Sequence, residues 1–112
     1  MPTPTPAPPP LPDADQALID AWLDGQWLER GLSRHTLDNY GRDLRQFGQW
    51  LAARHQGLAR CQRSDVLDYL AGRVGISARS LARQLSAMRS FFRWMKRENR
   101  IAEDPTLNVA RP

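Results

Sequence analysis

The stretch SARSLARQLSAMRSFFRWMKREN, residues 77–99, decides the fold, because its side chains separate by type when they are placed on an α-helix. Large apolar side chains fall on one side of that helix: Leu81, Leu85, Met88, Phe91, Phe92 and Met95. The opposite side is polar and basic, and its residues are Arg79, Arg83, Ser86, Ser90, Arg93 and Arg97, flanked by Arg89 and Lys96. The pattern predicts a long helix that begins after the N-cap Ser77, ends near Asn99 and buries one face.

A second helix with the same division is predicted over about residues 33–57, with Ser33 as its N-cap. Its inward-facing apolar side chains are Leu37, Tyr40, Leu44, Phe47 and Leu51. Its outward-facing polar side chains are Asn39, Arg42, Arg45, Gln46 and Gln49. Gly41 and Gly48 lie inside this helix, where each glycine costs roughly 1 kcal/mol relative to alanine, so we expect a less regular helix.

Two further helices complete the predicted domain. One covers residues 13–30 and stops at Gly31, and a shorter one starts at the N-cap Ser64 and ends within residues 72–75. No stretch shows the sustained alternation of a β-strand. The sequence therefore predicts an all-α domain of four helices.

Residues 1–12 differ in composition from the rest of the chain, because they contain seven of the nine prolines. Proline lacks the amide donor that helices and sheets require. We expect these residues to form an extended, disordered tail in front of the helical domain.

Composition and charge favour a single domain with a polyanionic partner. The 112 residues are 41% hydrophobic and 25% charged, as in a compact globular domain. The net charge is +4 and the pI about 10.2, which favours nucleic acid. Residues 77–99 carry a net charge of +5 and residues 13–30 a net charge of −4. A single basic face follows if the second and fourth predicted helices pack side by side.

The basic side of residues 77–99 has two interpretations. Arginine clamps phosphate or forks onto the guanine edge in a major groove, whereas a solvated basic face only aids solubility. Ordinary surface helices mix both signs, and Glu98 is the single acidic residue here, which favours DNA binding. Aromatic side chains also stack on bases in single-strand binders, but their helical spacing among leucines predicts that most are core. They are Trp22, Trp27, Trp50, Phe91, Phe92 and Trp94.

Residues that carry catalysis, metals or cofactors are scarce. Cys61 is the single cysteine, so it forms no internal disulfide and completes no metal-ligand spacing, as expected in a reducing cytoplasm. His35 and His55 stand apart from other candidate ligands, and the sequence contains no glycine-rich phosphate loop. No apolar run approaches the roughly 20 residues of a membrane span. We therefore expect a binding protein without a metal, a cofactor, a small-molecule substrate or a membrane partner.

Two segments resemble the amino-terminal domain of Xer-type tyrosine recombinases. The segment WLERGLSRHTLDNYGRDLRQFGQWL, residues 27–51, resembles the start of that domain, with a Leu-Ser turn before a helix that bears threonine and tyrosine. The segment SARSLARQLSAMRSFFRWMKRENRIAEDPTLNV, residues 77–109, resembles its end. Together they extend the resemblance over about residues 17–112. It implies a SAM-like four-helix bundle, the core-binding domain of these enzymes, and overall similarity favours the Xer type over the phage integrases.

The resemblance also implies that the second and fourth helices face duplex DNA at a recombination half-site. The implied DNA contacts are Arg34, Asn39, Arg42, Arg45, Arg79, Ser80, Arg83, Ser86, Arg89, Ser90 and Arg93. Arg89, within the motif LSAMR, is the best supported of them.

In the family, the tyrosine nucleophile and the residues that stabilise charge lie in a carboxy-terminal domain. The resemblance therefore implies no catalytic residue in this chain, and neither Tyr40 nor Tyr69 is a candidate. Residues 13–103 are then the DNA-binding domain, and residues 104–112 begin the linker to the absent catalytic domain. The implied partners are double-stranded DNA and paired recombinase protomers in a tetramer of the full-length protein. The implied setting is the bacterial cytoplasm and nucleoid, where such enzymes resolve chromosome dimers at cell division.

Three other interpretations stay open. The chain is alternatively a helical module whose basic face docks an acidic protein, a phage-type integrase domain, or an independent helix-turn-helix regulator that dimerises on palindromic DNA. Steep dependence of affinity on salt distinguishes a DNA-binding domain from a protein-binding one.

Overall fold

The computed structural model describes residues 9–109, which form a helical bundle. Its helices are α1 (Asp13–Arg30), α2 (Arg34–Ala53), the short 3-10 helix η1 (Leu58–Arg60), α3 (Arg63–Ala71) and α4 (Ala78–Arg97). No strand occurs in this part of the chain, so the prediction of an all-α domain with four α-helices is confirmed. None of the described helices is both long enough and apolar enough to cross a bilayer. Most of the predicted tail, residues 1–8, lies outside the described residues.

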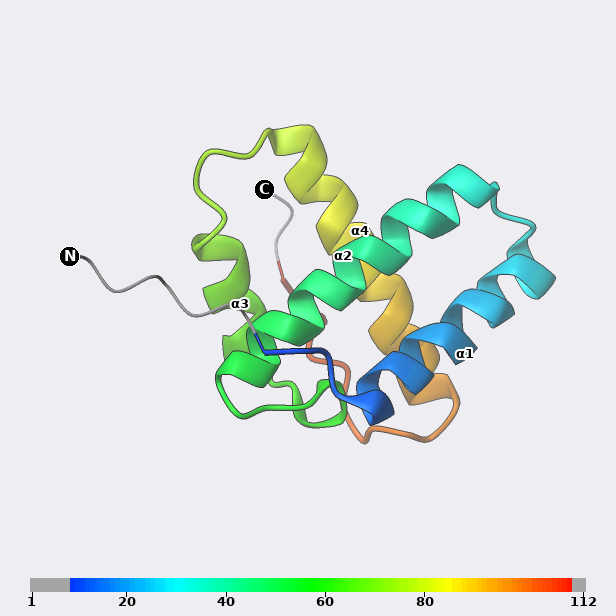
Figure 1. Cartoon of the computed structure of the whole chain (residues 1–112), viewed down its shortest axis with the longest axis horizontal. Helices are drawn as coiled ribbons and strands as arrows, with labels where there is room; N and C mark the ends of the chain where they lie inside the picture. Colours follow the sequence, from blue (N-terminus) through cyan, green and yellow to red (C-terminus); the bar gives the residue numbers. More distant parts are fainter. Residues whose placement is uncertain (1–8, 110–112) are drawn as a thin grey trace.

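α1 and α2 form an antiparallel hairpin, and α2 and α4 cross near the middle of the domain (Figure 1). Gly31 makes the turn between α1 and α2 with a left-handed φ of 58°, which costs glycine little because it has no Cβ. Ser33 then caps α2 by accepting the amide of Thr36 at 3.2 Å. α3 lies beside the far end of α2, away from this turn (Figure 1).

The apolar faces of α1, α2 and α4 meet in an aromatic core. Phe47 of α2 lies edge to face with Phe92 of α4, and Trp22 of α1 lies edge to face with Phe91. All the predicted inward-facing side chains of α2 and α4 are buried or half-buried. Of the aromatic residues expected in the core, Trp27 is the exception, because its side chain is 56% exposed.

The two glycines inside α2 mark close approaches rather than irregularities. A Cβ on Gly48 would lie 2.5 Å from Cδ1 of Leu11, and one on Gly41 would lie 3.1 Å from Cδ1 of Leu23 in α1. α2 nevertheless runs unbroken from Arg34 to Ala53, so the expected loss of regularity is not seen. Leu11 was predicted to belong to the tail, but it packs against the core.

α2 ends earlier than the sequence predicts, at Ala53 rather than near Gly57. The chain turns here because His55 takes a left-handed φ of 60° and its amide donates to the carbonyl of Ala52 at 3.0 Å. α4 likewise ends two residues before the predicted Asn99, which itself has a φ of 57°.

The N-cap of α3 is Gln62, not Ser64 as predicted. The backbone amide of Gln62 donates to Oδ2 of Asp65 at 2.9 Å, and its side chain accepts an amide in return. This reciprocal capping box satisfies amides that have no partner within the helix. Ser64 therefore lies inside the first turn of α3.

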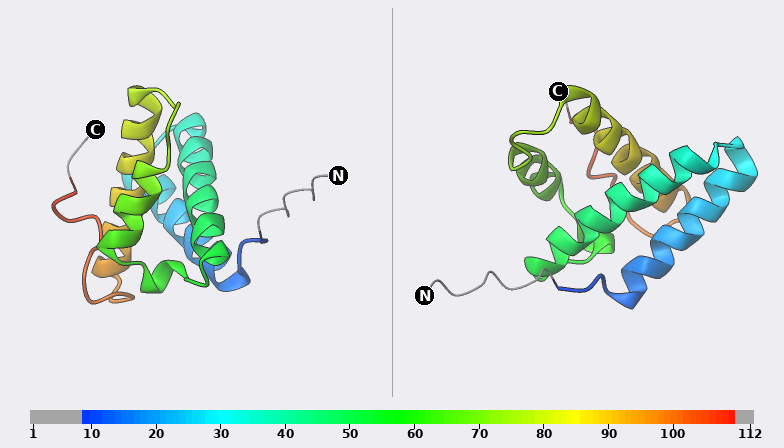
Figure 2. Two further views of the ribbon diagram at one scale, coloured as in Figure 1. Left: turned by 90° about the vertical axis from the view of Figure 1, so that its left-hand side faces the viewer. Right: turned by 45° about the horizontal axis from the view of Figure 1, so that its top comes forward.

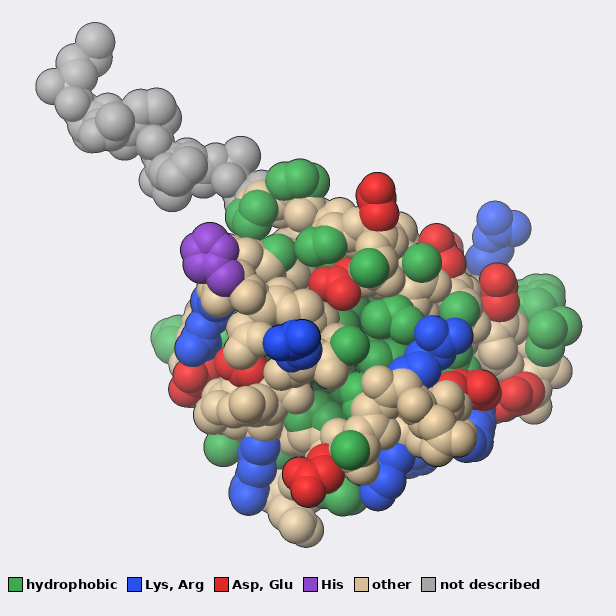
Figure 3. Space-filling view, turned by 90° about the horizontal axis from the view of Figure 1, so that it is seen from below, with side chains coloured by type: hydrophobic (Ala, Val, Ile, Leu, Met, Phe, Trp, Pro, Cys, Tyr) green, Lys and Arg blue, Asp and Glu red, His purple; other side chains and the backbone are tan. Residues whose placement is uncertain are grey.

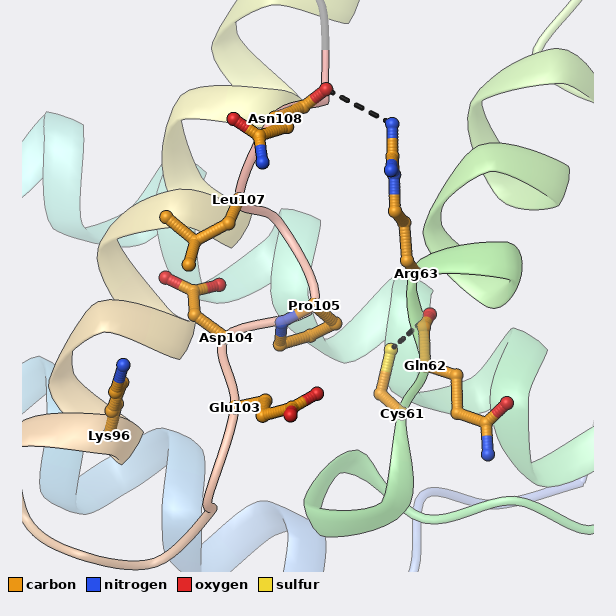
Figure 4. Close-up of a pocket in the computed structure, with 9 residues that line it drawn as sticks. All are labelled: Cys61, Gln62, Arg63, Lys96, Glu103, Asp104, Pro105, Leu107 and Asn108. Carbon is orange, nitrogen blue, oxygen red and sulfur yellow. Dashed lines mark hydrogen bonds between the residues drawn. The ribbon is translucent and has the colours of Figure 1, made fainter.

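Residues 104–109, which we call the C-terminal strap, turn back along the bundle (Figure 2). The carboxylate of Asp104 accepts the amide of Thr106 at 2.8 Å and its hydroxyl at 2.6 Å. Thr106 and Val109 are each only 3% exposed. Arg63 of α3 donates to the carbonyl of Asn108 at 3.2 Å (Figure 4). A linker was predicted from residue 104, but this part of it packs on the bundle.

Candidate nucleic-acid interface

The outer face of α4 carries exposed cations. Arg79 and Arg93 are exposed, with the exposed Ser86 between them, and α4 contains no acidic residue. Three ion pairs form among the described residues, and none of them includes Arg79 or Arg93. Their guanidinium groups are therefore available to bind an external anion.

Arg83, another predicted DNA contact, is committed to a partner inside the protein. Its Nε and Nη2 donate to the two carboxylate oxygens of Asp43 at 3.0 and 3.1 Å. Asp43 is 3% exposed, and its hydrogen bonds to Arg83 raise the pKa of the guanidinium. The paired geometry makes Arg83 a bridge between α4 and α2.

Arg89 is also held within the domain. It is half-buried, and its Nη2 donates to the carbonyl of Val109 in the C-terminal strap. A guanidinium has five N–H donors, so this contact leaves others for a ligand. Arg89 thus connects the outer face of α4 to the end of the described chain.

Two of the three predicted serine contacts have internal roles. Ser80 takes part in the N-cap of α4, since its amide donates to the hydroxyl oxygen of Ser77 at 3.1 Å. The hydroxyl of Ser90 accepts the indole N–H of Trp22 at 3.2 Å and donates to Gln26 at 3.3 Å. These bonds fix α4 against α1.

The predicted contacts on α2 do not form one group. Arg42 is exposed, and the amide of Asn39 lies 3.2 Å from the ring nitrogen Nε2 of His35. Arg34 instead lines a hollow at the seam between α1 and α2. Arg45 curls back over Gly41, on the side of α2 that meets α1. The structure therefore does not bring Arg34 and Arg45 together with the cations of α4.

A hollow of about 310 Å³ opens between the α1–α2 turn and the outer face of α4, and we call it the basic hollow. Its lining residues are Arg30, Leu32, Tyr40, Ser86, Arg89, Ser90 and Arg93. It joins four predicted residues of α4 to Arg30 and Tyr40, which were not predicted as contacts. Arg30 ends the acidic α1 and Tyr40 belongs to an apolar face, so the polar pattern of neither helix indicated them.

Cys61 and Tyr69 are held in their protonated forms at neutral pH. Burial raises the pKa of Cys61 to about 12, with a smaller contribution from the carboxylate of Asp65. Burial also raises the pKa of Tyr69. Residues 9–109 contain no group of three His, Cys, Asp or Glu side chains that could hold a metal. The arginines of α4 and of the basic hollow instead offer positive charge and hydrogen-bond donors, which are the groups that bind anions.

The surface is not basic all round. Figure 3 shows the domain from below, where acidic and basic side chains alternate around apolar ones. This mixture of charges differs from α4, whose residues Ala78–Arg97 include no acidic side chain.

The fold is that of a small helical domain with one basic helix, α4. Residues 19–99 match the family described as the phage integrase N-terminal SAM-like domain. This match covers most of the chain, and the chain belongs to that family.

Full-length relatives narrow the resemblance. The chain is 47% identical over 100 residues to the tyrosine recombinase XerD of Pseudomonas aeruginosa, covering 88% of this chain and 34% of that protein. It is 45% identical over 104 residues to XerD of Pseudomonas putida, covering 91% and 35%. For XerD of Ralstonia nicotianae the identity is 41% over 97 residues, covering 86% and 32%. The resemblance to Xer-type recombinases is confirmed, and each of these relatives is named tyrosine recombinase XerD. The chain spans about a third of the length of these relatives.

Proposed function

We propose that this chain is the DNA-binding domain of a site-specific tyrosine recombinase of the XerD type and helps to clamp a recombination half-site. The observation that carries the proposal is the outer face of α4, where Arg79 and Arg93 are exposed without ion pairs and Arg93 also lines the basic hollow. Family membership and the relatives named tyrosine recombinase XerD support it. Phosphate contacts from such arginines position a protein on duplex DNA.

The wider activity of the whole protein is part of the same proposal. In the proposed role this chain, which spans about a third of the relatives, supplies DNA binding and no strand transfer, and strand exchange is carried by another part of the recombinase. In the full-length protein, paired recombinase protomers form a tetramer in the bacterial cytoplasm. The reaction served is the resolution of chromosome dimers at cell division.

The test is a titration of fluorescently labelled duplex DNA with this chain, followed by anisotropy at several salt concentrations. Each neutralised phosphate contributes a slope of about −0.9 to log K against log salt. We expect binding at low salt and a slope steep enough to report several phosphates. Failure to bind any duplex at low salt would refute the proposal.

A protein-interaction module remains the second candidate, because Trp27 and Leu28 are 56% and 81% exposed at the end of α1. Exposed apolar side chains of this size mark protein contacts when they cluster. Binding to a protein partner with little dependence on salt, together with no affinity for duplex DNA, would favour this second function.

A further inference from the structure

We propose that the basic hollow binds one backbone phosphate of the DNA, and that Arg30 is one of its ligands. The inference rests on the proposed function and deepens it, because it assigns a contact to α1, the most acidic helix of the domain. The lining of the hollow includes the three arginines Arg30, Arg89 and Arg93, and no carboxylate. Arginine binds phosphate through paired hydrogen bonds, so three guanidinium groups around one hollow form a site for a phosphodiester.

The turn after α1 places Arg30 at the hollow. Arg30 is the last residue of α1, and Gly31 reverses the chain directly after it with a φ of 58°. Leu32 also lines the hollow, and Ser33 then caps α2, which begins at Arg34. The charge of Arg30 is favourable at this position on its own account, because the carboxyl end of a helix is partially negative.

A neighbouring acidic residue does not cancel this charge. A second hollow shares Arg30 and Arg93 with the basic hollow, and its lining also includes Glu29. Glu29 is already paired with Arg97, whose Nη2 lies 3.1 Å from Oε2. The positive charge of Arg30 and Arg93 is therefore left for an external anion.

The walls of the hollow are built before any ligand arrives. Tyr40 stacks on Trp22, with ring planes 5° apart, and Ser90 is held by bonds to Trp22 and Gln26. Arg89 is restrained by its bond to Val109. Restraint of the side chains before binding lowers the entropy cost of ordering them on a ligand.

A larger hollow elsewhere lacks this consistency of charge. It lies between the start of α3 and the C-terminal strap and has a volume of about 620 Å³ (Figure 4). Arg63 and Lys96 line it together with Glu103 and Asp104. The opposite charges offset one another there, so the basic hollow is the better phosphate site among the described residues.

The experiment compares Arg30→Ala with Arg60→Ala in this chain, using anisotropy with a mixed-sequence duplex. Arg60 is an exposed residue of η1 that does not line the basic hollow, so its substitution removes the same charge elsewhere. We expect Arg30→Ala to weaken binding roughly tenfold at low salt, as for loss of a hydrogen bond to a charged group. Its salt slope should become shallower by about one. Arg60→Ala should stay within about twofold of the unmodified chain, since exposed distant charges are screened.

A second measurement locates the phosphate. Single methylphosphonate linkages, which are uncharged, are placed one at a time along the duplex. We expect one position at which the uncharged linkage weakens binding by the unmodified chain. At that position the same linkage should not weaken binding by Arg30→Ala any further. The circular dichroism of each variant shows that it is folded.

The outcomes separate the two proposals. If the unmodified chain binds no duplex, the proposed function fails and the assignment of the hollow fails with it. If the chain binds with a steep salt slope but Arg30→Ala behaves like Arg60→Ala, the proposed function stands and the assignment of the hollow is wrong.

Discussion

Arg83 on α4 holds the carboxylate of Asp43 on α2 through two hydrogen bonds of 3.0 and 3.1 Å. Asp43 is 3% exposed, so these hydrogen bonds offset the cost of burying its carboxyl group. The pair joins the two helices that the family resemblance predicts to face DNA, so Arg83, a predicted contact, already has a partner inside the domain.

We expect Arg83→Ala to lower the free energy of unfolding by about 2 kcal/mol, because it leaves a buried carboxylate unpaired. The loss is smaller than the roughly 3 to 5 kcal/mol of a fully buried pair, since the Arg83 side chain is 38% exposed. Asp43→Asn should cost less, because Arg83 can then reach water. Urea denaturation measures both variants, and the double variant should lose less than the sum of the two. Strict additivity would contradict the pairing.

The bond from Arg89 to the carbonyl of Val109 predicts that Arg89→Ala loosens the C-terminal strap. The amide of Val109 donates to the carbonyl of Thr106 at 3.2 Å, and its hydrogen exchange should become faster. Ser86→Ala is the matched control, because Ser86 is exposed on the same helix one turn earlier. Unchanged exchange in Arg89→Ala would show that burial and the bond from Arg63 to Asn108 hold the strap without Arg89.

Gly31 and Gly25 should respond to alanine in opposite directions. Gly31→Ala places a Cβ at a left-handed φ of 58°, at a cost of roughly 1 to 2 kcal/mol. Gly25 lies inside α1, and a Cβ there would meet only Nε1 of Trp94 at an ordinary 3.7 Å. Gly25→Ala should therefore raise the free energy of unfolding by about 0.5 to 1 kcal/mol. Urea denaturation of both variants provides the measurement. A change in the free energy of unfolding in the same direction for both variants would contradict the prediction.

Asp15 predicts a specific dependence of stability on pH. Burial raises the pKa of Asp15 above its ordinary 3.8, although its carboxylate accepts the amide of Leu58, which opposes the shift. Because the folded state holds this proton more tightly than the unfolded state, the free energy of unfolding falls as the pH rises from 3.8 through the raised pKa.

Asp15→Asn removes this titration. The variant should therefore gain stability relative to the unmodified chain as the pH rises through that window, until the difference reaches a plateau. Urea denaturation at a series of pH values measures the difference. Asp24→Asn, on the exposed side of the same helix, is the control. A difference for Asp15→Asn that stays constant with pH would show that its carboxyl titrates alike in both states.

Local signals in the sequence were enough to predict the helices. The predicted bounds of α1 agree with the structure, and Ser33 and Ser77 are the N-caps that their positions indicate. Caps and apolar periodicity depend on residues within a turn or two of one another. Gln62 caps α3 through its reciprocal bonds with Asp65, although serine and not glutamine is favoured at an N-cap, so the local rule indicated Ser64.

The sequence by itself determined the four helices, the apolar face of each long helix and the excess of positive charge on the last one. Only the tertiary structure decided which cations are free. Arg83 binds Asp43, which is 40 residues away in the sequence, Arg89 binds the carbonyl of Val109 in the strap, and Arg30 lines the basic hollow although its helix is acidic. The periodicity of one helix records which side chains face outward, but their partners come from other helices, and those are placed only when the apolar faces pack together.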